Sequence, residues 1–286
     1  DYEAIKAINP GVIYCSITGF GQTGPYAPRA GYDFIVQGIG GIMDLTGSPE
    51  GEPQKIGVAF ADIFTGVYAT IAILAALNRR NATGEGANID MALLDTQVAV
   101  LANQAMNYLV SGTAPRRLGN AHPNIVPYQV FQAADGPIIV AAGNDPQFAR
   151  VCDLLELQTL KTDERFRTNA ARVANRAALV PLIEAETLKR QSQDLLAAVE
   201  AAGVPAGPVN RLDQVFADPQ VVARHLRQDL PRLGGTSVPT VRGPIIMDGE
   251  PCLAATASPA LGEHTSRILE LFASGNDPWL VFGGDA

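Results

Sequence analysis

The residue of this 286-residue chain with the clearest potential for chemistry is Asp62. It lies in the segment GVAFADIFTGVYATIAILAAL, where small residues lead into an apolar stretch that carries no charge from Ile63 to Leu77. Such a stretch predicts a helix over residues 63–80 that is buried on most sides. A carboxylate at its start either caps the helix by accepting hydrogen bonds from the first N–H groups, or is a reactive group in a dry site.

These two roles of Asp62 are compatible. The helix dipole favours negative charge at an N-terminus, so we expect it to hold the carboxylate ionised. An ionised carboxylate needs no general base to act as a nucleophile. Where water is excluded, it can attack an activated acyl group and form a mixed anhydride without losing it to hydrolysis.

A glycine motif near the N-terminus invites a different interpretation. Gly19, Gly21 and Gly24 form a GxGxxG pattern after the apolar, β-rich run at residues 12–17, which we predict to be a buried strand. A dinucleotide site would need a helix to open at the third glycine, but the prolines and the further glycine in residues 25–31 prevent one. We therefore interpret the motif as a flexible loop, of the kind that often lines an active site.

Metal and hydrolase chemistry find little support in the sequence. The histidines, His122, His225 and His264, share no spacing typical of metal ligands, and none lies in a Cys/His cluster, so we predict no metal site. No serine occupies a G-x-S-x-G elbow, so a hydrolase triad is not indicated. His122 lies in an irregular loop, and its role stays open.

Composition limits the partners and the compartment. The net charge of −8 argues against a nucleic-acid partner, which would require clustered Lys and Arg. Cysteines 15, 152 and 252 are odd in number and far apart, which favours a reducing compartment, the cytoplasm or, in a eukaryote, the mitochondrion. No uncharged apolar run reaches about 18 to 20 residues, so we expect no membrane partner.

The remaining pattern predicts the organisation of the chain. We expect a second helix from about Asp95 to 110, a hairpin in YQVFQAADGPIIVAAG with its turn at Asp135-Gly136, and a helix capped by Asp145 that runs through Leu157. Further helices are expected in 169–202, and the closing LGEHTSRILELF predicts a short capped helix. The predicted segments are 1–118, 119–228 and 229–286, the last returning to the first domain.

Several blocks of the chain together resemble the family III CoA-transferases, the CaiB/BaiF family that includes formyl-CoA, carnitine and succinate–hydroxymethylglutarate CoA-transferases. The matching blocks are INPGVIYCSITGFGQTGPYAPRAGYDFIVQGIGGIM, GVAFADIFTGVYATIAILAAL, TGEGANIDMALLDTQVA, GVPAGPVNRLDQVFADPQV and LGEHT. The stretches IVPYQVF and AAGNDPQFARVC look closest to the succinate–hydroxymethylglutarate type.

The resemblance implies a fold and an assembly. The fold would be α/β, with a Rossmann-like large domain and a small α+β domain, in an interlocked homodimer. The chain begins without Met and in what looks like mid-domain, so we expect that an N-terminal segment of the large domain precedes it.

The resemblance also implies a mechanism in which Asp62 is the nucleophile. Asp62 would pass through an aspartyl anhydride and an aspartyl-CoA thioester while CoA moves from an acyl-CoA to a small carboxylic acid, with no ATP or metal. Formyl-CoA transferase carries a run of consecutive glycines in a loop over its nucleophile, whereas this chain has GNAHPNIVPY in that region. This departure favours an acid other than oxalate or formate, such as the dicarboxylates succinate or glutarate.

The family's CoA-contacting positions match one loop, Ala30, Gly31, Tyr32 and Asp33, and one further residue, Leu93. From its charge alone, we add Arg29 as a contact for a CoA phosphate. The structural alternative for Tyr32 is a half-buried aromatic that serves packing.

Two other functions remain open. The related α-methylacyl-CoA racemases share the aspartate but pair it with a histidine in a Gly-His-Asp loop, where this chain has Gly31, Tyr32 and Asp33. Tyrosine, with a pKa near 10, is a poor replacement for imidazole at neutral pH. The second alternative is an inactive, truncated CoA-binding module, suggested by the expected missing segment.

Overall fold

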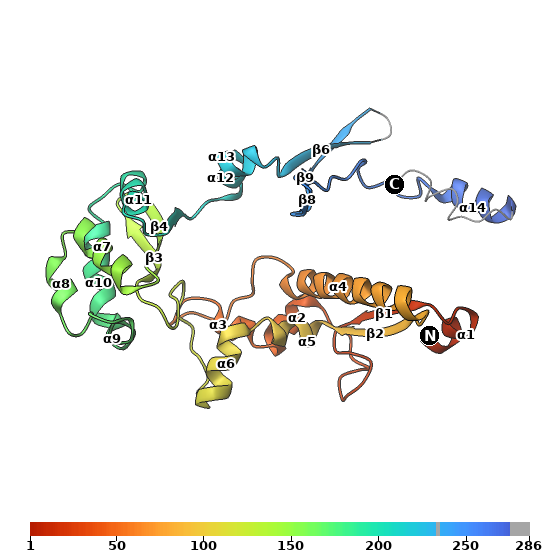
Figure 1. The fold of residues 1–286 in the computed structure, drawn as a ribbon, viewed down its shortest axis with the longest axis horizontal. Coiled ribbons are helices and arrows are strands. Elements are labelled where there is room, and N and C mark those ends of the chain that lie inside the picture. Colours follow the sequence, from red (N-terminus) through yellow and green to blue (C-terminus); the bar gives the residue numbers. More distant parts are fainter. Residues whose placement is uncertain (233–234, 275–286) are drawn as a thin grey trace. The chain divides into compact units, whose positions relative to one another are not determined.

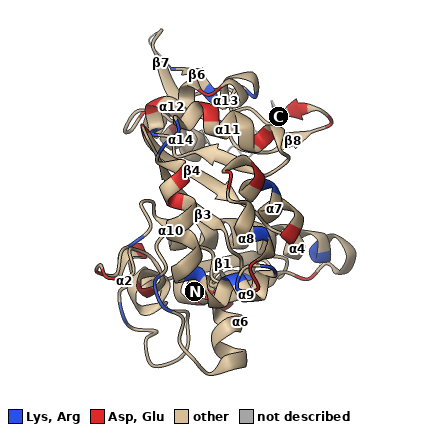
Figure 2. Cartoon of the chain, turned by 90° about the vertical axis from the view of Figure 1, so that its left-hand side faces the viewer, with Lys and Arg blue, Asp and Glu red and all other residues tan. Residues whose placement is uncertain are grey.

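The computed structural model describes residues 1–232 and 235–274, and the chain divides into two compact units, Asp1–Pro208 and Val209–Ala286 (Figure 1). The domain boundaries expected from the sequence, after residues 118 and 228, are not tested by this division into compact units and stay a prediction. Charged residues are spread over many elements, and most of the chain is uncharged (Figure 2). Each unit is described by itself.

The first unit begins with a parallel β–α–β arrangement. Strands β1 (Ile13–Thr18) and β2 (Ala87–Ala92) pair in parallel, in register from Ile13 opposite Ala87 to Thr18 opposite Ala92. The strand predicted at 12–17 is thus confirmed. The other elements of this part are α1 (Tyr2–Ile8), α2 (Asp33–Ile39), α3 (Ile42–Leu45), α4 (Phe60–Thr83), α5 (Leu93–Ala99) and α6 (Ala102–Ser111).

Helix α4 lies along both strands of this pair, as Figure 1 shows, but the expectation that it is buried on most sides is wrong. Its buried residues are small: Ala61, Thr65, Ala69 and Ala76. The large side chains of Ile63, Val67, Ile71 and Leu74 are each more than half exposed, at 54%, 51%, 56% and 60%. The helix therefore packs through a row of small residues and leaves what we call the apolar stripe of α4, these four large residues, open.

By length and composition alone, α4 is the one helix in the described part of the chain that could cross a membrane. The sequence had suggested no such segment, because charged residues near the helix ends interrupt the apolar run. A single helix of this kind is weak evidence, and no membrane partner is inferred from it.

The second predicted helix, from Asp95 to 110, is two helices. Helix α5 ends at Ala99, and α6 begins at Ala102, where the backbone φ is 49°. A positive φ at a non-glycine residue is incompatible with a continuous right-handed helix. The break turns the chain between the two helices.

The remainder of the first unit is a three-stranded antiparallel sheet with helices. The strands β3 (Tyr128–Ala133), β4 (Gly136–Ala141) and β5 (Ala206–Pro208) follow that order in the sheet. The helices are α7 (Asp145–Leu154), α8 (Gln158–Thr162), α9 (Asn169–Ala174), α10 (Arg176–Thr187) and α11 (Ser192–Ala201). A large hydrophobic core joins sheet and helices, with Phe131, Ile138, Phe166, Leu179 and Leu195 at most 2% exposed.

Two local predictions in this part were displaced by one residue. The hairpin is confirmed, but Ala133 pairs with Gly136, so the turn is Ala134-Asp135 and not Asp135-Gly136. Helix α7 is capped by Asn144, whose side chain accepts a hydrogen bond from the Gln147 N–H, and it ends at Leu154. Asp145 does not cap the helix, and its Oδ1 instead forms an ion pair with Arg172 Nη2 at 2.7 Å.

The second unit contains short elements. They are α12 (Leu212–Ala217), α13 (Pro219–Ala223), the antiparallel pair β6 (Arg227–Pro231) and β7 (Ser237–Val241), the pair β8 (Ile246–Met247) and β9 (Glu250–Pro251), and α14 (Thr265–Ser274). The helix predicted near the end of the chain is confirmed as α14.

Candidate active site

Asp62 lies in the first turn of α4, as its third residue, with its side chain exposed. It is not the N-cap, as the sequence had allowed, because the capping position is Ala59, which has no side chain able to cap. Within the described residues, no hydrogen bond or ion pair reaches the Asp62 carboxylate. A carboxylate without a structural partner at the start of a long helix is chemically available.

The cap of α4 comes from another helix. Asp33, the first residue of α2, accepts a hydrogen bond from the Ala61 N–H at 2.8 Å through Oδ1, and the Asp62 N–H lies 3.4 Å from the same oxygen. The Phe60 N–H donates to the Val58 carbonyl at 2.8 Å. The first N–H groups of α4, which no helical carbonyl can accept, are thereby satisfied.

Gln37, one turn after Asp33 in α2, is fully buried and joins the same network. Its Nε2 donates to Asp33 Oδ2 at 2.7 Å and lies 3.3 Å from the Val58 carbonyl, while its Oε1 accepts from the Ile56 N–H at 2.9 Å. The side chain thus ties α2 to the segment that leads into α4. Sequence reasoning missed Gln37, although its spacing of four residues from Asp33 was a usable signal.

The electrostatics at Asp62 run opposite to the expectation from sequence. Partial desolvation, followed by the negative charge of nearby Asp33, raises the pKa of Asp62 above the ordinary range for aspartate. The helix N-terminus had been expected to hold the carboxylate ionised. Asp33 occupies the N–H groups that would have stabilised it and adds a like charge.

The loop predicted to contact CoA is held by a close backbone approach. A Cβ atom added to Gly31 would lie 2.5 Å from the Cα of Gly19, and one added to Gly19 would lie equally close to Gly31. The Gly19 carbonyl also accepts from the Leu94 N–H at 3.1 Å. The glycine motif lies in a loop, and the start of the motif, Gly19, meets Gly31 just before Tyr32 and Asp33.

The predicted CoA-contacting residues lie in different surroundings. Tyr32 is 73% exposed, so it is not the half-buried packing aromatic considered from sequence. Ala30 is exposed and Gly31 partly buried. Leu93 is only 7% exposed and packs in a small core with Phe20, Val36 and Ala61. This core links α5 to the first turn of α4.

Arg29 is exposed and stacks on aromatic rings. Its guanidinium lies 4.3 Å from the ring centroid of Tyr26 and 5.2 Å from that of Phe20. Within the described residues no carboxylate pairs with it. Its charge is therefore open to an anionic group, as the assignment to a CoA phosphate requires.

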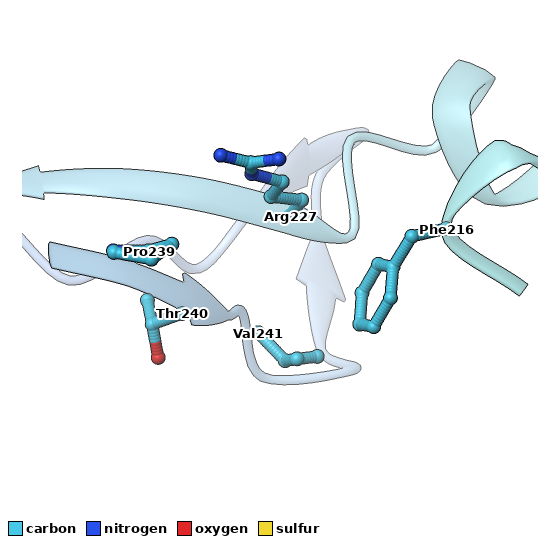
Figure 3. A pocket seen from close by; sticks show the side chains of 5 residues that line it. All are labelled: Phe216, Arg227, Pro239, Thr240 and Val241. Atoms are coloured by element: carbon cyan, nitrogen blue, oxygen red, sulfur yellow. The ribbon is translucent and has the colours of Figure 1, made fainter. Parts of the chain in front are cut away.

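The remaining candidates are a histidine of the first unit and a pocket of the second. His122 accepts a hydrogen bond from the Asn124 N–H through Nδ1 at 3.1 Å, and its ring packs 5.1 Å from that of Tyr128. Among residues 1–232 and 235–274, no cluster of three His, Cys, Asp or Glu side chains is arranged to hold a metal ion. A pocket of about 350 Å³ in the second unit is lined by Phe216, Arg227, Pro239, Thr240 and Val241 (Figure 3).

Known proteins resemble this chain over nearly its whole length. Residues 1–265 match the family model of CoA-transferase family III. The succinate–glutarate CoA-transferase of Agrobacterium fabrum is 57% identical over 269 residues, which cover 94% of this chain and 67% of that protein. The succinyl-CoA:glutarate CoA-transferase of Homo sapiens is 43% identical, with 94% of this chain and 61% of that protein covered.

A solved structure agrees with these relatives. The crystal structure of a CaiB/BaiF family protein from Brucella suis superposes with a TM-score of 0.80 at 58% identity, covering 94% of this chain and 70% of that one. The chain thus spans about two thirds of the length of the relatives that it matches. The resemblance indicated by the sequence blocks is confirmed.

Proposed function

This chain belongs to CoA-transferase family III, and we propose that it takes part in moving CoA from an acyl-CoA thioester to a free dicarboxylic acid. The names of the two relatives above support succinate and glutarate as the acid pair. The observation that carries the proposal is the Asp62 carboxylate, which is exposed, has no partner among residues 1–232 and 235–274, and lies beside the loop that resembles the family's CoA-contacting loop.

Asp62 begins the proposed reaction as a nucleophile. One of its carboxylate oxygens attacks the carbonyl carbon of the donor thioester, a C–O bond forms, and the C–S bond breaks with its electron pair leaving on the CoA sulfur. The products are an aspartyl–acyl anhydride and CoA thiolate. Desolvation and the charge of Asp33 raise the pKa of Asp62, so its ionised form is a stronger base than an ordinary aspartate carboxylate.

The thiolate then completes the first half of the transfer. It attacks the Asp62 carbonyl carbon of the anhydride, and the donor acid leaves as its carboxylate, which produces an aspartyl-CoA thioester. The acceptor carboxylate attacks that thioester and expels the thiolate, which gives a second anhydride. Attack of the thiolate on the acceptor's acyl carbon releases the new acyl-CoA and restores Asp62. Each step exchanges one activated carbonyl for another, so the cycle requires no ATP.

The CoA site is proposed from exposure and charge. Ala30 and Tyr32 are exposed and precede α2. Arg29 lies on the same loop, and no carboxylate of the described part of the chain pairs with it. We assign the loop Ala30–Asp33 to the CoA chain through its backbone and Tyr32, and Arg29 to a phosphate. Leu93 supports this loop from the core beneath it.

The finer fold and the assembly are also proposals. The parallel pair β1–β2 with α4 between the strands in sequence supports a Rossmann-like large domain. The apolar stripe of α4 supports a homodimer, because exposed apolar surface of this kind is typical of subunit interfaces. An interlocked homodimer would also help to exclude water from Asp62.

Trapping at Asp62 tests the proposed function directly. With succinyl-CoA as donor, hydroxylamine should convert Asp62 to a hydroxamate that peptide mass spectrometry locates, and Asp62→Ala should abolish both the adduct and CoA transfer to glutarate. Asp62→Asn keeps the shape of the side chain and removes its charge, so it tests whether the ionised carboxylate itself is required. Transfer by Asp62→Ala at the wild-type rate would refute the mechanism.

A further inference from the structure

The contacts around the first turn of α4 carry an inference that goes beyond the resemblance, which assigns Asp33 only to CoA. Both carboxylate oxygens of Asp33 are already used within the protein. Oδ1 accepts from the Ala61 N–H at 2.8 Å and Oδ2 accepts from Gln37 Nε2 at 2.7 Å. A carboxylate engaged on both sides is a poor candidate for a direct substrate contact.

The neighbours of Asp33 leave the helix dependent on it. Ala59, at the capping position, offers no side-chain acceptor. The segment before α4 is fixed mainly through Gln37, which accepts from the Ile56 N–H at 2.9 Å and faces the Val58 carbonyl. The backbone that carries Asp62 is thus located by α2, through two side chains 19 to 28 residues away in sequence.

We propose that Asp33, braced by Gln37, is a positioning residue that holds the first turn of α4 so that the Asp62 carboxylate meets the thioester carbonyl. This inference rests on the proposed nucleophilic role of Asp62. A nucleophile must be held close to its reactive position, because a displacement of about 1 Å can lower the rate about 100-fold. Asp33 Oδ1 lies against the N–H groups of Ala61 and Asp62, so it fixes the backbone that carries the nucleophile.

The charge of Asp33 adds a second effect in the same direction. Desolvation raises the pKa of Asp62 most, and the charge of Asp33 raises it further. Since the intrinsic nucleophilicity of a group falls as its pKa falls, the residue that locates Asp62 also adds to its reactivity. Asp33→Asn removes the negative charge and keeps the Oδ1 that caps the helix, but its Nδ2 replaces the oxygen that accepts from Gln37 Nε2, so this variant also loses the Gln37 hydrogen bond.

Steady-state kinetics of CoA transfer test the proposal in the complete protein. Asp33→Ala should lower kcat by about 10- to 100-fold while KM for the acyl-CoA changes little, because positioning acts on the chemical step. Asp33→Asn, which keeps the Oδ1 cap but loses the bond from Gln37, should lower kcat less than Asp33→Ala and move the acid limb of its pH profile to lower pH. Ala59→Ser in the Asp33→Ala background should recover much of kcat by supplying a local cap.

A matched control separates positioning from general stability. Asp135 also caps a helix from outside it, accepting from the Ser192 N–H at 2.6 Å and Ser192 Oγ at 2.9 Å at the start of α11. Asp135→Ala should lower Tm to a similar degree as Asp33→Ala but leave kcat unchanged. If Asp33→Ala does not fold, Asp33→Asn and Gln37→Leu carry the same comparison.

The outcomes distinguish this inference from the proposed function. Loss of activity in Asp62→Ala together with wild-type kcat in Asp33→Ala would overturn the positioning role alone. A rise in KM with unchanged kcat would also overturn it and assign Asp33 to CoA binding. Wild-type activity in Asp62→Ala would overturn both proposals. A fall in kcat in Asp33→Ala that Ala59→Ser reverses is the supporting result.

Discussion

Asp33 and Asp62 place two carboxylates at one end of α4, where Asp33 Oδ1 lies 2.8 Å from the Ala61 nitrogen and 3.4 Å from that of Asp62. In the part of the chain that the structure describes, only Asp33 receives hydrogen bonds on its carboxylate. Asp33 accepts the N–H groups that a helix N-terminus offers, and Asp62 is left with desolvation and a like charge, which raise its pKa. The helix end thus gives its stabilisation to one carboxylate and leaves the other reactive.

This arrangement predicts a specific dependence of stability on pH. Because the pKa of Asp62 is raised in the folded protein, the folded state binds that proton more tightly than the unfolded chain does. The free energy of unfolding should therefore fall as pH rises from the ordinary aspartate range through the folded pKa. Asp62→Asn removes this loss, so its Tm relative to the wild type should be higher at pH 7 than at pH 3.

Asp135 provides a control of opposite sign. Hydrogen bonds from the Ser192 backbone and side chain lower the pKa of Asp135, so its ionisation stabilises the fold above the unfolded pKa. Asp135→Asn should therefore lose Tm relative to the wild type as pH rises from 3 to 7. Thermal unfolding of both variants across this range is the measurement, and parallel Tm differences in the two variants would contradict the assignment.

Arg172 should be the residue at which the part of the first unit built from β3–β5 and α7–α11 is most sensitive to mutation. Its side chain is fully buried, donates to the Val126 carbonyl at 2.6 Å and the Phe166 carbonyl at 2.9 Å, and pairs with Asp145 at 2.7 Å. Arg172→Met leaves the two carbonyls without this donor and should reduce the free energy of unfolding by about 2 to 5 kcal/mol, because each buried acceptor left unpaired costs about 1 to 3 kcal/mol.

Arg167 is the matched control for that substitution. It pairs with Glu164 at 3.2 Å, with 63% of its side chain exposed. Arg167→Met should change the free energy of unfolding by no more than about 1 kcal/mol, because an exposed ion pair contributes little. Urea unfolding of both variants checks the contrast, and equal effects would show that Arg172 is not the central polar group of this part.

The burial of the three cysteines predicts the order in which an alkylating reagent modifies them. Cys152 is fully buried, and burial raises the pKa of its thiol to about 12, whereas Cys252 is exposed. Burial also raises the pKa of Cys15. Iodoacetamide at pH 8 should modify Cys252 first and Cys152 only after unfolding, because the thiolate is the reactive form. Peptide mass spectrometry over time would show the order, and early labelling of Cys152 in the folded protein would contradict it.

Sequence reasoning located Asp62 and most of the elements around it, because strand β1 and helix α4 carry strong local patterns. It failed where distant residues decide the outcome. The cap of α4 comes from Asp33, which is 28 residues from Ala61, and no local pattern reports that contact. The uncharged run after Asp62 indicated burial, but only small residues of α4 are fully buried, so the exposed side of α4 could not be predicted from charge.

That exposed side gives the last prediction. If the apolar stripe of α4 is a subunit interface, Ile71→Lys at its centre should place a charge in an apolar contact and shift the mass from dimer to monomer. Ile8→Lys on α1 is the matched control, since Ile8 is 83% exposed and lies outside the stripe, and it should leave the mass unchanged. Light scattering coupled to size exclusion measures both variants. A wild-type protein that is monomeric, or an Ile71→Lys variant that stays dimeric, would show that the stripe serves another contact.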